Sequence, residues 1–377
     1  MKLIHTSDWH FGMPLGTGNY EDCQRFFLDR LYELIQKEKV EAVLCAGDIY
    51  DSSVTNADAI RLFNDAATTL CRDLGVKFIL IAGNHDSAAR LSSCHELLRA
   101  AGMYVFGSLV RDPEPVLLDG DKVAVYCLPY FTRDEVTSLF PEKKEEIRSM
   151  EDAYQVVCDH IREQMDPKRK NILMAHAFIV NAELSDSDRA ARVGTATAIS
   201  AGVFDGFDYV ALGHIHKPQV ITPRVRYCGT PVKYSFGAEE KQDKGVVLVD
   251  TDTMEQTFVV LPMLRDRRTV SGTYEEILAR EDIREDFLRL DITDRFAGLE
   301  LFADLKEKFP WLLELTGKSL GTDRETSSLT VQELESLDDG DIMLKFLAEV
   351  AGTEPTGEQL QLFRQALEEY DRGGDLG

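Results

Sequence analysis

Five short polar clusters constrain the fold of this chain more than any other feature of its sequence. Each cluster directly follows a run of apolar residues that is typical of a buried β-strand. The clusters are Asp8-Trp9-His10, Gly47-Asp48-Ile49-Tyr50-Asp51, Gly83-Asn84-His85-Asp86, Ala175-His176 and Gly213-His214-Ile215-His216. In open α/β sheets the carboxyl ends of the strands border the ligand crevice, so side chains that follow five strands can meet there. We therefore expect these clusters, which are far apart in the sequence, to form one site.

Histidine is concentrated in these clusters. The chain has 8 histidines, and those at positions 10, 85, 176, 214 and 216 all lie in a cluster. We expect His5, inside the first strand, to be hydrogen-bonded in the core, and His95 and His160, on helical stretches, to lie at the surface. A random scatter would seldom produce this distribution, so the clustered histidines are predicted to share a function.

The clusters offer side chains that can bind metal ions, namely Asp8, His10, Asp48, Asn84, His176, His214 and His216. Carboxylate, amide and imidazole donors together favour first-row divalent ions such as Mn²⁺ over a structural zinc site built from thiolates. There are too many donors for one ion and about enough for two. Two neighbouring cations need a shared anionic ligand, and Asp48 is our candidate for this bridge. Such a pair can bind phosphate oxygens and activate a water, so hydrolysis would need no covalent protein intermediate.

Two further residues are candidates for proton transfer. His85 follows Asn84 directly, and an imidazole can give or share a proton near neutral pH. Asp51 lies three residues beyond Asp48, where its carboxylate could orient and charge that imidazole. We assign His85 as the catalytic acid and Asp51 as the residue that orients it.

The first two-thirds of the chain alternates short apolar runs with longer amphipathic stretches, as in sheets flanked by helices. We predict strands at residues 2–6, 42–46, 77–82, 123–128, 172–175, 209–212, 245–249 and 257–261, and helices at residues 22–38, 57–74 and 149–164. This pattern indicates an α/β fold in which two sheets pack face to face with helices outside them.

A domain boundary is expected at Pro262-Met263, because a dense run of charged residues follows it. We predict a main domain at residues 1–262, a small α/β unit at 263–325 and two helices within 326–377. In the small unit, Thr273-x-x-Glu276 is typical of a capping box, ahead of a strand at 287–292 and a helix at 299–308. The two terminal helices have apolar faces that either pack back on the body or dock onto another protein.

Charge and composition limit the classes of partner. The 42 basic and 66 acidic side chains give a net charge of −24, and more than half of the excess lies in residues 263–377. Any nucleic-acid binding must then rely on local basic patches, metal ions or a partner subunit. The candidate basic residues are Arg90, Arg189, Arg192, Lys217, Arg224 and Arg226.

The sequence also predicts where the protein works. The 7 cysteines form no Cys-x-x-Cys pair, so we expect reduced, mostly buried thiols rather than a disulfide framework. The first eight residues reach a carboxylate before any long apolar run, and no later stretch has the ~18 apolar residues of a spanning helix. We therefore expect a soluble, cytoplasmic protein without membrane contact.

Taken together, the clusters resemble the complete signature of the calcineurin-like metallophosphoesterases. Within that superfamily, Thr6-Ser7-Asp8-Trp9-His10-Phe11-Gly12, Ala82-Gly83-Asn84-His85-Asp86-Ser87 and Ala211-Leu212-Gly213-His214-Ile215-His216-Lys217 resemble the Mre11/SbcD nucleases. The resemblance implies a four-layer αββα sandwich that binds two Mn²⁺, or Mg²⁺ in their place. It places one ion on Asp8, His10, Asp48 and His216, and the other on Asp48, Asn84, His176 and His214. It also implies that His85 is the acid and that Asp51 supports it; Ala175 stands where relatives can have glycine.

The same resemblance implies a biological role. It predicts a Mn²⁺-dependent DNA nuclease subunit, with 3′–5′ exonuclease activity on duplex DNA and endonuclease activity on single strands and hairpins, that acts in DNA repair, recombination and replication. It further implies that residues 263–325 are a capping domain and that residues 326–377 dock onto a coiled-coil ABC-type ATPase of the SbcC/Rad50 kind. A homodimer within a heterotetramer would form through the helices at 22–38 and 57–74. A phosphoesterase acting on a small diester or monoester, and a non-catalytic tether for the ATPase, are the alternatives.

Overall fold

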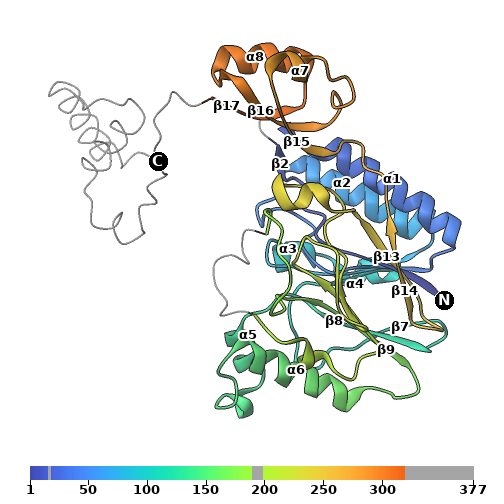
Figure 1. Cartoon of the computed structure of the whole chain (residues 1–377). Coiled ribbons are helices and arrows are strands. Elements are labelled where there is room, and N and C mark those ends of the chain that lie inside the picture. Colours follow the sequence, from blue (N-terminus) through green and yellow to red (C-terminus); the bar gives the residue numbers. More distant parts are fainter. Residues whose placement is uncertain (16–17, 189–197, 319–377) are drawn as a thin grey trace, which may run out of the picture. The chain divides into compact units, whose positions relative to one another are not determined.

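The computed structural model describes residues 1–15, 18–188 and 198–318 of the chain (Figure 1). The described residues belong to one compact unit over Met1–Lys318. The two helices predicted within residues 326–377 lie outside the described residues. The division at 262/263 and 325/326 stays a prediction.

Two six-stranded sheets form the body of this unit. The first sheet has the order β14 (Glu255–Val260), β13 (Gly245–Asp250), β1 (Lys2–Thr6), β4 (Ala42–Cys45), β5 (Lys77–Ile81) and β6 (Met103–Phe106). The second has the order β11 (Gln219–Thr222), β12 (Val225–Tyr227), β10 (Tyr209–Gly213), β9 (Lys170–His176), β8 (Val123–Leu128) and β7 (Val116–Leu118). The strands β1, β4, β5 and β6 are mutually parallel, and so are β8, β9, β10 and β12. Their carboxyl ends therefore open on a common edge of each sheet.

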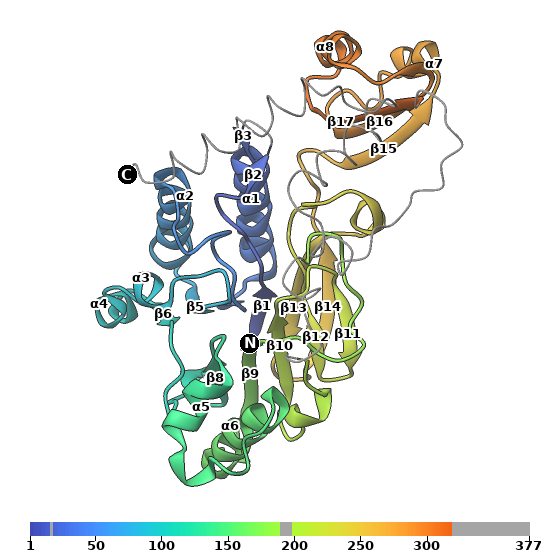
Figure 2. The same cartoon turned by 90° about the vertical axis from the view of Figure 1, so that its left-hand side faces the viewer.

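Side-chain alternation along the strands produces the layers. In the first sheet, Ile4, Val43 and Phe78 face the helices α1 (Glu21–Glu38) and α2 (Ala57–Thr68), whereas Leu3 and Leu44 face the second sheet. The other face of the second sheet packs against α5 (Arg133–Leu139) and α6 (Met150–Gln164). In Figures 1 and 2, α1 and α2 lie on one side of the paired sheets and α5 and α6 on the other. The predicted four-layer αββα sandwich is confirmed.

The histidines outside the clusters and the cysteines lie largely where their sequence context predicts. His5 is buried between the sheets, where Nδ1 lies 2.7 Å from the Tyr209 hydroxyl and Nε2 lies 3.1 Å from the Leu212 carbonyl. His95 is exposed, and His160 is half-buried beside Asp112. All seven cysteines are free thiols. Among the described residues, no helix combines the length and the apolar character needed to cross a membrane.

Local signals set the ends of several elements. Ser149 caps α6 and Thr273 caps α7 (Tyr274–Leu278), each with a complete capping box. The predicted helix at 57–74 is α-helical only to Thr68 and continues as a π-helical turn over Thr69–Asp73. The shorter elements are β2 (Pro14–Leu15), β3 (Gly18–Asn19), α3 (Ala88–Leu91), α4 (His95–Ala100) and the 3₁₀ turns η2 (Pro141–Lys143), η5 (Ala201–Phe204) and η6 (Gly237–Lys241).

A separate three-stranded parallel sheet follows the sandwich. It has the order β15 (Arg267–Gly272), β16 (Phe287–Phe296) and β17 (Leu312–Lys318), with α7 and α8 (Leu299–Lys308) packed on it. Ile277, Leu290 and Leu305 belong to its own small core. The predicted strand at 287–292 and helix at 299–308 are both confirmed.

Candidate metal centre

The five clusters meet at the carboxyl ends of β1, β4, β5, β9 and β10. Asp8 and His10 follow β1, Asp48 follows β4, and the other donors follow β5, β9 and β10. Three groups of donor atoms each lie within 4.8 Å of one another: those of Asp8, His10 and His216, those of Asp8, Asp48 and His176, and those of His10, Asp51 and His85. The structure thus brings side chains from distant segments of the sequence to one place, and their roles as ligands stay a prediction.

Several of the donors have an unusual backbone conformation. The φ angles of Asp8, His10, Asp48 and His214 are 53°, 46°, 50° and 102°, in the left-handed region that non-glycine residues rarely adopt. Such conformations cost about 1–3 kcal/mol each and gather at functional sites. Main-chain hydrogen bonds hold the loops in place, from Asp8 N to the Gly47 carbonyl (2.9 Å) and from His10 N to the Asp48 carbonyl (3.0 Å). The strain is thus borne by the same loops that carry the donors.

Two glycines allow the donors to approach each other. A Cβ atom at Gly83 would lie 2.1 Å from Oδ1 of Asp48, and one at Gly47 would lie 2.4 Å from Nδ1 of His176. Gly47 also has a φ of 92°, which a side chain disfavours. The glycines in the motifs are therefore required by close packing around the donors.

We name the first group of donors, Asp8, His10 and His216, the His216 end. Nε2 of His10 lies 3.1 Å from Nε2 of His216, and both rings are buried. Burial and the neighbouring His10 hold the pKa of His216 well below its usual range, so its ring is neutral and keeps a lone pair for a metal. Burial raises the pKa of Asp8 to about 6 in spite of the nearby His176.

We name Asn84, His176 and His214 the His176 end. Nε2 of His176 lies 3.0 Å from Oδ1 of Asn84 and 3.3 Å from Oδ2 of Asp48. Nδ1 of His214 lies 2.9 Å from the same Asn84 oxygen, and Nδ1 of His176 lies 2.8 Å from the Ala46 carbonyl.

Asp48 lies between the two ends. Its Oδ2 is 3.3 Å from Nε2 of His176 and 3.8 Å from Nε2 of His10. Burial opposes its ionisation, but His176 and His10 hold the pKa of Asp48 well below its usual range. A buried carboxylate that stays ionised between two sets of imidazoles is suited to bridge two cations. The donor set, oxygen and nitrogen without thiolate, fits divalent metal ions of the Mn²⁺ or Mg²⁺ type.

His85 and Asp51 also meet at the site, but through different atoms from those predicted. Nδ1 of His85 lies 2.8 Å from the main-chain carbonyl of Asp51, whereas the Asp51 carboxylate lies 3.5 Å from Nδ1 of His10. The expectation that the carboxylate itself orients His85 is corrected, because the turn after β4 aims the carbonyl at that ring. The His85 main-chain N–H donates to Oδ1 of Asp48 at 2.9 Å, which ties this loop to the centre.

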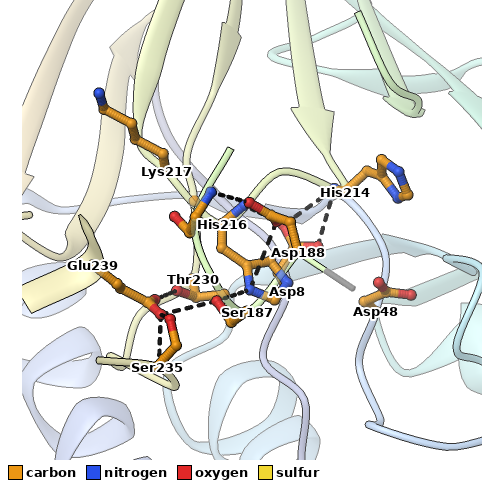
Figure 3. A network of polar contacts seen from close by, with 12 residues as sticks. Asp8, Asp48, Ser187, Asp188, His214, His216, Lys217, Thr230, Ser235 and Glu239 are labelled. Atoms are coloured by element: carbon orange, nitrogen blue, oxygen red, sulfur yellow. Dashed lines mark hydrogen bonds and ion pairs between the residues drawn. The ribbon is translucent and has the colours of Figure 1, made fainter. Parts of the chain in front are cut away.

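Sequence reasoning gave no role to several buried residues of the site. Asp86 accepts hydrogen bonds from the main-chain N–H groups of Ile49 (3.1 Å), Tyr50 (3.0 Å) and Gly83 (2.9 Å), and so joins the loops after β4 and β5. The signal that could have indicated this role is the position of Asp86 in the cluster Gly83-Asn84-His85-Asp86. Ser187, Asp188 and Glu239 lie around His216 (Figure 3). Lys244 contacts the His216 carbonyl and Glu239. No local pattern marks these four, because the fold decides which polar residues meet and which of them, here Asp188, Glu239 and Lys244, are buried.

The basic residues that the sequence suggests for DNA contact differ in their exposure and in their partners. Arg226 is only 7% exposed, so it is not available to a phosphate backbone. Lys217 pairs with Glu183, and Arg90 is exposed and donates to the Ser53 carbonyl at 2.7 Å. Arg224 donates at 3.5 Å to a main-chain carbonyl, whereas positions 189 and 192 lie outside the described residues.

Comparison with known proteins assigns the class. The family model of the calcineurin-like phosphoesterases matches residues 1–218, and the chain belongs to this family of metal-dependent phosphoester hydrolases. Over nearly its whole length the chain is similar to the SbcD component of the nuclease SbcCD from Staphylococcus saprophyticus. The two are 29% identical over 365 residues, which cover 95% of this chain and 96% of the relative. The resemblance to the SbcD nucleases seen in the motifs is thereby confirmed.

Solved structures give more distant similarities. An archaeal phosphodiesterase is 14% identical, with 69% of this chain and 100% of that chain covered and a TM-score of 0.33. GAP50 of Plasmodium is 15% identical, with 88% and 99% covered and a TM-score of 0.38. The assignment of the family rests on the match over residues 1–218.

Proposed function

We propose that this chain is the nuclease subunit of a two-component DNA-processing enzyme and hydrolyses phosphodiester bonds with two divalent cations, Mn²⁺ or Mg²⁺. The observation that carries the proposal is the meeting of the predicted donors around Asp48, between His10 and His176. The similarity to the SbcD component of an SbcCD nuclease over 95% of the chain supports DNA as the substrate.

The donors divide between two cations in the proposed mechanism. The His216 end and Asp48 would hold one, and Asp48 with the His176 end would hold the other. When bound, such cations neutralise charge on the phosphate and lower the pKa of a water to near neutrality. Nδ1 of His176 is hydrogen-bonded to the Ala46 carbonyl and Nδ1 of His216 to the Ser187 hydroxyl, and these contacts keep Nε2 of both rings toward the other donors.

His85 is proposed to protonate the leaving oxygen. Its Nδ1–H donates to the Asp51 carbonyl, so a protonated Nε2 is free to donate to substrate. The same carbonyl stabilises the positive charge of the ring while it carries both protons. The Asp48 contact to the His85 main-chain N–H holds this acid beside the donors.

The finer activities and partners are those that the resemblance to the Mre11/SbcD nucleases implies. We propose exonuclease action in the 3′–5′ direction on duplex ends, endonuclease action on single strands and hairpins, and a homodimer joined to two copies of an SbcC-type ATPase. Residues 263–325 would cap the DNA site, and residues 326–377 would dock onto the ATPase. The cytoplasmic location stays a prediction.

Activity measurements with matched variants test the catalytic proposal. His85→Gln and Asp8→Ala should each abolish Mn²⁺-dependent cleavage of a DNA hairpin while the circular dichroism spectrum stays that of the parent. His95→Gln, at an exposed histidine outside the site, is the control and should cleave normally. Retained cleavage in either site variant would contradict the assigned role.

Substrate class is tested by comparing DNA with a plain phosphodiester and a plain phosphomonoester under one Mn²⁺ titration. The proposal predicts that DNA and the diester are cleaved and that the monoester is not. Preferential hydrolysis of the monoester would favour the alternative, a phosphoesterase acting on small substrates.

Partner binding is tested by deletion. Removal of residues 340–377 should abolish co-purification with the ATPase and spare hydrolysis of the plain diester. An intact complex after this deletion would refute the docking role of the terminal segment.

A further inference from the structure

His216 is held at three points by side chains from two separate loops. Its main-chain N–H donates to Oδ1 of Asp188 (2.9 Å), its carbonyl accepts from Nζ of Lys244 (2.9 Å), and its Nδ1 lies 2.7 Å from Oγ of Ser187. Figure 3 shows Ser187 between His216 and Glu239. Glu239 extends this network of hydrogen bonds. It lies on η6, and its Oε2 lies 2.8 Å from Oγ of Ser187.

The charge state of Glu239 sets the direction of these hydrogen bonds. Its Oε1 lies 2.7 Å from Nζ of Lys244, and both side chains are 0% exposed. A buried carboxylate paired with an ammonium at this distance is ionised, so it only accepts hydrogen bonds. It also accepts from Thr230 (3.2 Å) and from the main chain and hydroxyl of Ser235 (2.8 and 2.6 Å).

The Ser187 hydroxyl has a single proton to donate. A hydrogen bond to an ionised carboxylate is about twice as strong as one to a neutral group, so this proton goes to Glu239. The oxygen of Ser187 then presents a lone pair to His216, and Nδ1 of His216 must carry the proton that fills this contact. In the opposite arrangement Ser187 would point a lone pair at the carboxylate, with the Ser187–Glu239 hydrogen bond lost.

We propose that Ser187 and Glu239 are positioning residues that hold His216 as the tautomer protonated on Nδ1, so that its Nε2 lone pair is available to a divalent cation. The inference rests on the metal centre of the proposed function. Loss of a group that orients a ligating histidine typically weakens metal affinity about 10–100-fold. Glu239 and Lys244 contact no donor side chain directly, so they act through Ser187 and through the His216 carbonyl.

A pair of serine variants tests this relay, by which we mean the hydrogen bonds that run from Glu239 through Ser187 to His216. Ser187→Ala removes the hydroxyl between Glu239 and His216, whereas Ser235→Ala removes a hydroxyl that donates to the same Glu239 oxygen without touching His216. Calorimetric titration with Mn²⁺ should show one of two sites weakened about 10–100-fold in Ser187→Ala. Ser235→Ala should retain both affinities. Equal affinities in parent and Ser187→Ala would overturn the proposal.

A direct reading of the tautomer needs no variant of the relay. In long-range ¹H–¹⁵N spectra of the metal-free parent, with His216→Gln used for assignment, His216 should show a protonated Nδ1 and a bare Nε2. A proton on Nε2 would refute the relay even if Ser187→Ala failed to fold. A parent that binds no Mn²⁺ would instead refute the metal centre itself, so the two failures are distinguishable.

Discussion

The two ends of the metal centre are held in different ways. At the His176 end, the ring donates to the main-chain carbonyl of Ala46 at 2.8 Å and packs against Gly47. At the His216 end, the orientation of the ring depends on side chains, Ser187 and Glu239, from loops far away in the sequence. A carbonyl is present whatever residue stands at position 46, but a relay of side chains is lost with a single substitution. A single substitution can therefore disturb the orientation of His216 while the His176 end stays as it is.

The histidines for which the two ends are named, His176 and His216, also differ in charge. Burial lowers the pKa of a histidine, but at His176 the contact with Asp48 outweighs burial and raises the pKa to about 9. At His216, burial and His10 lower it well below the usual range. A metal ion that binds Nε2 of His176 would then displace a proton, whereas the ring of His216 is already neutral.

Asp48→Ala should have the largest effect, because it removes the carboxylate that contacts both ends. We expect DNA cleavage to fall at least about 10³-fold, which corresponds to about 4 kcal/mol of transition-state stabilisation. Calorimetry should show that both Mn²⁺ sites are weakened. The control Asp252→Ala, whose carboxylate is 72% exposed, should behave as the parent. One unaffected Mn²⁺ site in Asp48→Ala would contradict the bridging position.

Glu239→Gln should destabilise the His216 end and the whole fold, because it leaves Lys244 buried without its counter-charge. We expect a loss of about 3–5 kcal/mol in the free energy of unfolding near pH 7. Urea denaturation of parent and variant measures this difference.

The pH dependence of the same difference is a sharper check. Burial raises the pKa of a carboxyl group, but the Lys244 ammonium holds that of Glu239 at about 2. A lowered pKa stabilises the fold above the unfolded value of about 4.3 and loses this contribution as the pH falls toward 2. The difference between parent and variant should therefore shrink between pH 5 and pH 3. A difference that is constant over this range would show that the fold does not lower the pKa of Glu239.

Gly47→Ala tests the packing of the His176 end. The new Cβ would lie 2.4 Å from Nδ1 of His176, so we expect about 1–3 kcal/mol of overpacking in addition to about 1–2 kcal/mol of left-handed backbone strain. Gly75→Ala is the matched control, since Gly75 has a φ of 66° and nothing within 4 Å of the added atom. Equal urea midpoints for the two variants would argue against close packing at Gly47.

Tyr154→Phe should have the smallest effect. The Tyr154 hydroxyl donates to the His176 carbonyl at 3.2 Å, and its loss should cost about 1 kcal/mol of stability. Because the Ala46 carbonyl still orients the ring, Mn²⁺ affinity should stay within about twofold of the parent, in contrast to Ser187→Ala. A larger loss of affinity would mean that side chains position the His176 end as well.

Much of the fold could be predicted from local pattern. The strand at Lys2–Thr6 and the helix at Leu299–Lys308 have the predicted bounds, because the apolar pattern that predicts each of them acts within a few positions of the chain. The convergence of the donors could also be predicted, because parallel strands bring their carboxyl ends to one edge. The atom by which Asp51 contacts His85 could not, since it depends on the direction of one carbonyl in a turn.

The sequence by itself determined the chemistry of the centre, because carboxylate, amide and imidazole donors placed after successive strands leave few other arrangements. Only the tertiary structure decided how the donors are oriented. The ion pair of Glu239 with Lys244 and its reach through Ser187 to His216 exist because separate segments are buried together. Burial, which turns ordinary polar residues into directional hydrogen-bond partners, is a property of packing that no short stretch of sequence encodes.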